Sequence, residues 1–298
     1  MRRALTVALA LLAGGTGASG EELVRRFGQL TAAIDLTYAQ PGGIAVVRFR
    51  PALWAGSTFV IFEGRRVPVL PGAGGHRALV PIPASTPAGE GLLGIELYAR
   101  RGLQRLRLGF PIGERTFSER TQTLNEEKRA LLRQPNALRD GRRLMQAVRT
   151  FTNDALWRGP FRPPVAPPPS ETFGERESYI GGSPVEMMMD GGTSEQHRGL
   201  DYAVAVGQLV QAPAGGNVVM AEPLLLTGNT VVIDHGQGIV SMLCHLSQLD
   251  VGAGERVEGR ARLGLAGDTG VAQFAHVHWA VYLLGIPVDP NVVMKVLE

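Results

Sequence analysis

The sequence predicts a mainly β protein in which two β-rich regions are joined by a short helical connector. Three observations favour this fold class: short runs rich in β-branched and aromatic residues recur along the chain, glycine- and proline-rich turns separate them, and only one central stretch has a helical pattern. With 298 residues, 44% of them hydrophobic and 19% charged, the chain is long enough for two modest globular domains.

The first twenty residues have the pattern of a secretory signal. Two arginines precede an apolar stretch over 4–12, and small residues follow up to Gly20. The apolar stretch is too short to span a bilayer, and no later run reaches the roughly eighteen residues of a membrane helix. We therefore expect a cleaved signal over 1–20 and a mature protein that is periplasmic or secreted, with no membrane span; an ordinary apolar N-terminus is the alternative.

From residue 30 to about 115 the pattern predicts a small β-sandwich, expected to be Ig-like and to occupy 21–118. Leu106, Leu108 and Phe110 alternate with Arg107 and Gly109, as in a strand with one buried face. Short strands at this spacing, separated by turns, are typical of sandwiches. The expected strands are 33–38, 44–50, 58–62, 78–82, 92–98 and 103–110.

The connector is expected over 119–170. A capping-box pattern from Thr123 to Glu126 precedes a helical segment over 126–133 and 137–149, which breaks near Pro135. The proline-rich passage that follows, 159–169, is expected to be extended and semi-rigid.

A second β-rich domain is expected over 171–298. Its first part, 175–196, has a loop-like composition and is either a mobile flap or a plain surface loop. The strands expected after it are 200–206, 217–221, 230–234, 239–243, 262–266 and 276–284.

The charge balance does not favour generic nucleic-acid binding. Without Arg2 and Arg3 the chain carries 28 basic and 27 acidic residues. The charges are uneven, since 21–189 carries 23 basic and 16 acidic residues whereas 190–298 carries 5 and 11. Three interpretations of this uneven charge remain open. The two regions attract each other, the first region faces an anionic surface, or both have ordinary solvated surfaces.

Histidine is concentrated in the last third of the chain. Five of the six histidines lie there: His197, His235, His245, His276 and His278. Residues two apart on a strand project from the same face, so His276 and His278 can face one ion, and His197 and Asp201, four apart, can share a side. Imidazoles with one carboxylate suit Zn²⁺, and three protein ligands leave a fourth position for water. The pattern predicts a zinc site.

The order of the motifs resembles the lysostaphin/LytM-type zinc metallopeptidases of bacterial cell walls. The resemblance covers about Phe173 to Pro290, and the region 30–124 is similar to the β-sandwich that precedes this peptidase domain in some exported members. The motifs are His197-x-Gly199-x-Asp201, Ala212-Pro213, Gly228 to Gly236, His245-Leu246-Ser247, Gly267 to Gly270, His276-x-His278 and Val288-Asp289-Pro290.

The resemblance implies that His197, Asp201 and His278 bind zinc and that His245 and His276 form the catalytic pair. One imidazole of the pair would take a proton from water, and the other would stabilise the oxyanion. The implied substrate is the peptide part of peptidoglycan, cut by an endopeptidase in its stem or cross-link peptides.

Two other residues near these motifs have structural interpretations. The family keeps a histidine at the position of His235 without giving it to the metal. Cys244, the only cysteine, cannot form an intrachain disulfide and is expected to be buried on the opposite face from His245.

The sequence departs from the family at three places that are expected to lie in the substrate groove. Leu243 replaces a common tyrosine, Phe274-Ala275 replaces Gly-Pro, and 271–274 replaces a polar stretch. The leading interpretation is a zinc endopeptidase. The alternative is a non-catalytic scaffold or activator that binds the wall or a partner hydrolase, and a structural adhesin would leave the histidines unexplained.

Overall fold

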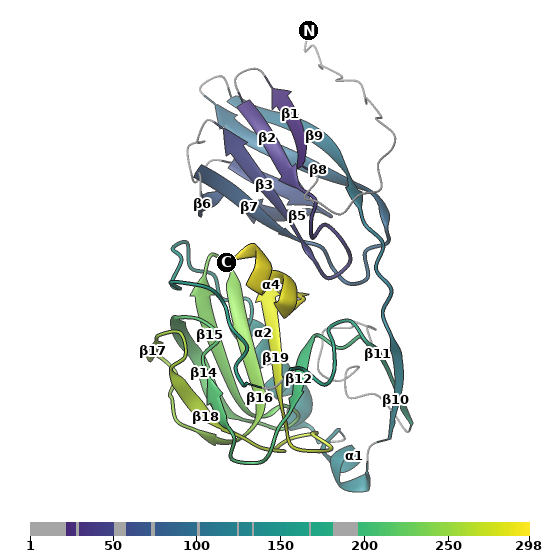
Figure 1. Ribbon diagram of the computed structural model, residues 1–298, viewed down its shortest axis with the longest axis vertical. Helices are drawn as coiled ribbons and strands as arrows, with labels where there is room; N and C mark the ends of the chain where they lie inside the picture. Colours follow the sequence, from purple (N-terminus) through teal and green to yellow (C-terminus); the bar gives the residue numbers. More distant parts are fainter. Residues whose placement is uncertain are drawn as a thin grey trace.

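A computed structural model shows a mainly β protein with two groups of sheets and a connector along one side (Figure 1). It describes residues 22–27, 30–50, 58–72, 75–99, 102–123, 125–132, 134–166, 168–180 and 196–298. The expected signal over 1–20 and most of the stretch 175–196 lie outside these residues. Within the described part of the chain, no helix is both long and apolar enough to cross a membrane.

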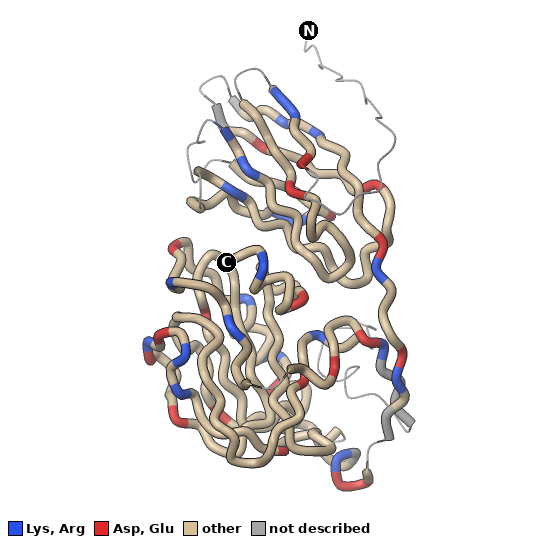
Figure 2. Tube along the Cα trace, in the orientation of Figure 1, with Lys and Arg blue, Asp and Glu red and all other residues tan. Residues whose placement is uncertain are grey.

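Two sheets pack face to face in the N-terminal region, and arginines dominate the charge on their strands (Figure 2). One sheet has the order β1-β2-β3-β7-β6 and the other the order β5-β4-β8-β9. Their strands are β1 (Glu22–Phe27), β2 (Leu30–Asp35), β3 (Ile44–Arg50), β4 (Thr58–Phe62), β5 (Arg65–Pro68), β6 (Leu70–Gly72), β7 (Gly75–Pro81), β8 (Gly89–Ala99) and β9 (Gly102–Ile112). Alternating apolar residues from both sheets form the buried core between them, among them Ile34, Val47, Phe49, Val60, Leu93 and Phe110.

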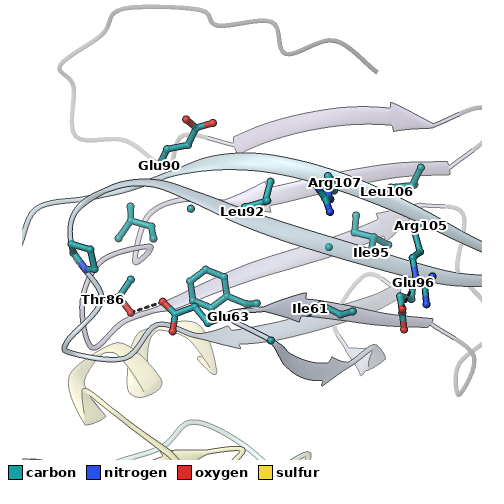
Figure 3. Close-up of a pocket in the computed structure, with 16 residues that line it drawn as sticks. Ile61, Glu63, Thr86, Glu90, Leu92, Ile95, Glu96, Arg105, Leu106 and Arg107 are labelled. Atoms are coloured by element: carbon teal, nitrogen blue, oxygen red, sulfur yellow. Dashed lines mark hydrogen bonds and ion pairs between the residues drawn. The ribbon is translucent and has the colours of Figure 1, made fainter. Parts of the chain in front are cut away.

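The four-stranded sheet carries an open hollow of about 600 Å³ (Figure 3). Glu96 in its wall accepts hydrogen bonds from Arg66 and Arg105, at 2.8 and 3.0 Å, and Glu63 accepts one from Thr86. Side chains of both charge signs therefore line the hollow, and no histidine or cysteine does. The histidine motifs lie elsewhere.

The connector contains two helices and one strand. Strand β10 (Glu119–Thr123) is followed by α1 (Glu126–Leu132) and α2 (Asn136–Ala147), with the expected break next to Pro135. The apolar face of α2 packs on the C-terminal sheet through residues such as Leu144 and Met145. Part of the stretch expected to be loop is instead strand β11 (Arg176–Ile180), because it pairs in parallel with β10.

The C-terminal region forms one nine-stranded sheet in which every strand pair is antiparallel. Its main order is β12-β19-β16-β15-β14-β17, and β13, β18 and β20 pair beside this path. The strands are β12 (Gly199–Ala203), β13 (Leu209–Gln211), β14 (Gly216–Leu224), β15 (Gly228–Gly236), β16 (Ile239–Leu249), β17 (Arg256–Val257), β18 (Arg262–Ala266), β19 (His276–Leu283) and β20 (Ile286–Val288). A terminal helix, α4 (Pro290–Val296), is capped at its N-terminus by Asp289, whose carboxylate accepts a hydrogen bond from Asn291 N.

The N-terminal sheets and the C-terminal sheet share a buried core. Ile44, Val46 and Leu79 from β3 and β7 belong to the same apolar cluster as the C-terminal strands. Asp289 N donates to Gly42 O at 2.8 Å, and Arg115 Nη2 lies 2.6 Å from Asp289 Oδ2. The two regions are therefore packed together rather than merely tethered.

Candidate metal centre and adjacent histidines

Strands β12 and β19 bring three potential metal ligands to one point. The strands are antiparallel neighbours in which Asp201 lies opposite His278, and His197 lies two residues before the start of β12. His197 Nε2 lies 3.1 Å from both Asp201 Oδ1 and His278 Nδ1, and His278 Nδ1 lies 2.7 Å from Asp201 Oδ1. His197 and Asp201 are buried, and the side chain of His278 is only 14% exposed.

These three atoms fit a small divalent cation. A tetrahedral zinc ion with bonds of about 2.0–2.1 Å needs ligand atoms about 3.3 Å apart. The observed separations of 2.7–3.1 Å approach this value. Two imidazole nitrogens and one carboxylate oxygen are also the donor set that zinc accepts.

The protonation of the group suits metal binding. Burial raises the pKa of Asp201, but charge interactions and hydrogen bonds with His197 and His278 outweigh it and hold that pKa well below its usual range. Burial lowers the pKa of His278. An ionised carboxylate and a neutral imidazole are the forms that coordinate metal.

Two further imidazoles lie beside this group. The rings of His245 and His276 are 4.6 Å apart between centroids, and those of His245 and His278 are 6.5 Å apart. His276 Nε2 is 3.7 Å from Asp201 Oδ2. Burial, together with the nearby His276, lowers the pKa of His245 to about 3. All five residues expected at the site are thus close together, while their individual roles remain predictions.

Backbone carbonyls orient three of the imidazoles in the same way. The Nδ1 atoms of His197, His245 and His276 lie 2.8–2.9 Å from carbonyl oxygens. The acceptors are Thr172 O, Thr269 O and Phe274 O, respectively. Because a carbonyl only accepts, each Nδ1 carries the proton and each Nε2 keeps its lone pair. These carbonyls could not be predicted from the sequence, since any residue type supplies one.

His235 lies away from the group and is fully buried, as a structural residue would be. Its Nδ1 donates to Gly215 O, and its Nε2 accepts from Ser241 Oγ, both at 2.8 Å. Ser241 Oγ in turn accepts from Trp279 Nε1 at 3.1 Å. Cys244 is also fully buried, as expected, in the apolar cluster beneath α2.

The expectation that Leu243 lies in a substrate groove is wrong. Its side chain is fully buried in the main core, because β16 pairs it between Val231 and Trp279. Phe274, by contrast, is 41% exposed, and its ring centroid is 5.1 Å from that of His276. Of these two substitutions, only Phe274 is exposed beside the site.

Comparisons with known proteins show that the histidine-bearing region is similar to peptidases. The model of peptidase family M23 matches residues 195–290. A stretch of 93 residues is 37% identical to the peptidoglycan DD-endopeptidase ShyA of Vibrio cholerae, covering 31% of this chain and 22% of that protein. A stretch of 94 residues is 34% identical to the DD-carboxypeptidase/endopeptidase Mpg of Neisseria meningitidis, covering 32% of this chain and 22% of that protein. Each match therefore spans only about a fifth of the curated relative's length.

The likeness to a solved structure extends further along the chain. A candidate M23 peptidase from Pseudomonas aeruginosa aligns with a TM-score of 0.58 and 29% identity. The alignment covers 87% of this chain and 96% of that chain, so it includes the N-terminal sheets as well as the histidine-bearing sheet.

Proposed function

We propose, from the premise that residues 195–290 are a domain of peptidase family M23, that this protein is an exported zinc-dependent endopeptidase of peptidoglycan. The observation that carries the proposal is the convergence of His197 Nε2, Asp201 Oδ1 and His278 Nδ1 beside two further imidazoles. Relatives named as peptidoglycan DD-endopeptidases support stem or cross-link peptides as the substrate. We assign 21–118 to a sandwich domain, 119–170 to the connector and 171–298 to the peptidase domain.

The proposed ligands are His197, Asp201 and His278. Zinc held by them would acidify water toward a pKa of about 7 and polarise the scissile carbonyl. The Thr172 carbonyl keeps the proton of His197 on Nδ1, so Nε2 has its lone pair available for the metal.

The proposed catalytic pair is His245 and His276. With both Nδ1–H groups bonded to carbonyls, only Nε2 of each ring can take up or share a further proton at the reacting centre. One Nε2 would take a proton from the attacking water and pass it to the leaving amine. The other ring, if it enters the reaction with a proton from solvent on Nε2, would donate a hydrogen bond to the oxyanion. The division between the two rings is left open.

A non-catalytic scaffold or activator is the alternative function. The exposed Phe274 beside His276 favours it, because a bulky ring there leaves less room for a peptide; Leu243 is buried in the core and gives it no support. The presence of three potential ligands and both neighbouring imidazoles favours the enzyme. A scaffold that only binds the wall or a partner hydrolase does not require imidazoles held in these orientations by hydrogen bonds.

Metal content and product analysis test the proposal together. The purified mature protein should contain about one zinc per chain by elemental analysis. It should release peptides from isolated peptidoglycan, with the cleaved bond identified by mass spectrometry of the muropeptides. His245→Ala should keep the metal and lose hydrolysis. Undiminished release by His245→Ala would remove that residue from the mechanism, and zinc retention without any hydrolysis by the wild type would support the scaffold.

A further inference from the structure

One short segment, residues 170–176, holds the backbones of two proposed ligands. Asp201 N donates to Glu171 O at 3.2 Å, and Asp201 O accepts from Ser170 N at 2.7 Å. His197 N donates to Glu175 O at 2.8 Å, and its own carbonyl accepts from Gly174 N at 2.7 Å. The positions of His197 and Asp201 therefore depend on where this segment lies.

The same segment also sets the proton on a ligand ring. Thr172 O, in its middle, accepts the Nδ1 proton of His197 at 2.9 Å. Outer hydrogen bonds of this kind orient a ligating imidazole and raise its basicity, and their loss typically lowers metal affinity by about 10–100-fold. A displacement of segment 170–176 would thus affect both backbone and ring.

An ion pair from the connector fixes the segment in place. Arg120 on β10 binds Glu171 through Nη1 and Oε1. The Glu171 side chain is only 5% exposed, whereas that of Arg120 is 39% exposed. Ser118 lies immediately before β10. Its backbone carbonyl accepts a hydrogen bond from Arg176 N at 2.7 Å, and its hydroxyl donates one to Glu175 Oε1 at 2.9 Å. Contacts from residues 118–120 thus reach both ends of the segment.

We propose that Arg120 is a positioning residue for the metal site, acting through Glu171. Glu171 lies directly opposite Asp201 in a β-bridge, so movement of one backbone is transmitted to the other. Without the guanidinium, the buried carboxylate would lack its cation and would turn toward water, drawing segment 170–176 away from Asp201 and His197. This inference rests on the proposed function, because it concerns zinc held by those residues.

A double-mutant cycle on zinc affinity tests the inference. Competition with a chromophoric chelator gives the zinc Kd of the full mature chain without any hydrolysis assay. Arg120→Met should weaken zinc binding by about 10–100-fold. Glu171→Gln, alone or together with Arg120→Met, should weaken it by about two- to tenfold, because the ion pair is lost but no buried charge is left unpaired. Arg262→Met, which breaks the Arg262–Asp250 pair on the far strand β18, is the matched control and should leave Kd unchanged.

The outcomes separate this inference from the proposed function. Arg120→Met that binds zinc as tightly as the wild type would overturn the inference, as would a double variant as weak as Arg120→Met. If Arg120→Met does not fold, Glu171→Gln still tests the inference, since wild-type zinc affinity in that variant would show that the Arg120–Glu171 ion pair does not affect the metal site. A wild-type protein that binds no zinc refutes the proposed function instead.

Discussion

At the residue scale, the imidazoles differ in the partners of their ring nitrogens. His197, His245 and His276 each give the Nδ1 proton to a carbonyl and keep Nε2 available. His235 uses both nitrogens within the core. The motif order in the sequence predicted five residues that the fold brings close together, but not these carbonyls. Each contact between a ring and a carbonyl depends on the local backbone conformation, for example on the positive φ of 65° at His245.

Removing one ligand should empty the metal site. His278→Ala leaves only two donors, so zinc content after dialysis should fall from about one per chain to near zero. His235→Gln, which changes a buried histidine outside the group, is the control and should keep its zinc. Equal zinc in His278→Ala and wild type would contradict the ligand assignment.

His235 should make stability depend on pH in a defined window. Burial lowers its pKa from 6.5 to about 4 in the folded protein. Between these pH values the unfolded chain binds a proton at His235 that the folded chain does not. The contribution of His235 to the free energy of unfolding is therefore fully present above about pH 6.5 and is lost as the pH falls toward 4. The loss should reach about 2 kcal/mol by pH 5.

Urea denaturation of metal-free wild type and His235→Gln checks this window. The variant lacks the titrating group, so the stability gap between the two proteins should shrink by about 2 kcal/mol from pH 7 to pH 5. Comparing the two proteins cancels the contributions of the other histidines. A gap that is the same at both pH values would contradict the assignment.

At the element scale, sequence patterns located most of the longer strands but missed the short ones and also the six-residue β1. The bounds 44–50, 58–62 and 262–266 are those observed for β3, β4 and β18, because turns flank each run of apolar residues. Strands of two to four residues such as β17 and β13 have too few residues for any periodicity. Helix α4 was missed because its seven residues carry little pattern and its start depends on the cap at Asp289.

The loop before β19 should tolerate no side chain at Gly270. This residue has φ +72°, and a Cβ there would lie 2.3 Å from Leu226 O and 2.4 Å from Gly228 N. The neighbouring Thr269 carbonyl holds His245, and Lys128 Nζ donates to Gly270 O at 2.7 Å. Gly270→Ala should therefore lower both stability and the rate of peptide release.

Gly254→Ala, in the turn between β16 and β17, is the matched control for Gly270→Ala. Gly254 also has a positive φ, +92°, but apart from the glycine and its two chain neighbours, no atom of the described residues lies within 4 Å of its added Cβ. The backbone strain alone should cost about 1–2 kcal/mol in either variant. Thermal melting should show a larger loss for Gly270→Ala, and only that variant should lose activity. Equal losses would mean that the close contacts at Gly270 relax freely.

At the scale of the whole molecule, the N-terminal sheets and the C-terminal sheet should unfold together. They share one apolar cluster, and Arg115 links them by its ion pair with Asp289. The guanidinium also lies 5.0 Å from the ring centroid of Phe117 and 5.6 Å from that of Phe173. The sequence predicted two β regions and left their attraction open, since neither the pairing of Arg115 with Asp289 nor the shared core has a local signal.

Arg115→Met tests this coupling. The side chains of Arg115 and Asp289 are only 19% and 7% exposed, so removal of the cation leaves a buried carboxylate unpaired and should cost about 3 kcal/mol. Circular dichroism reports on all the sheets, whereas tryptophan fluorescence includes Trp279 in the C-terminal core. The two urea transitions should coincide in the wild type and shift together in the variant. Separate transitions in the wild type, or a shift in Arg115→Met no larger than in Arg262→Met, would show that the two regions unfold independently of this contact.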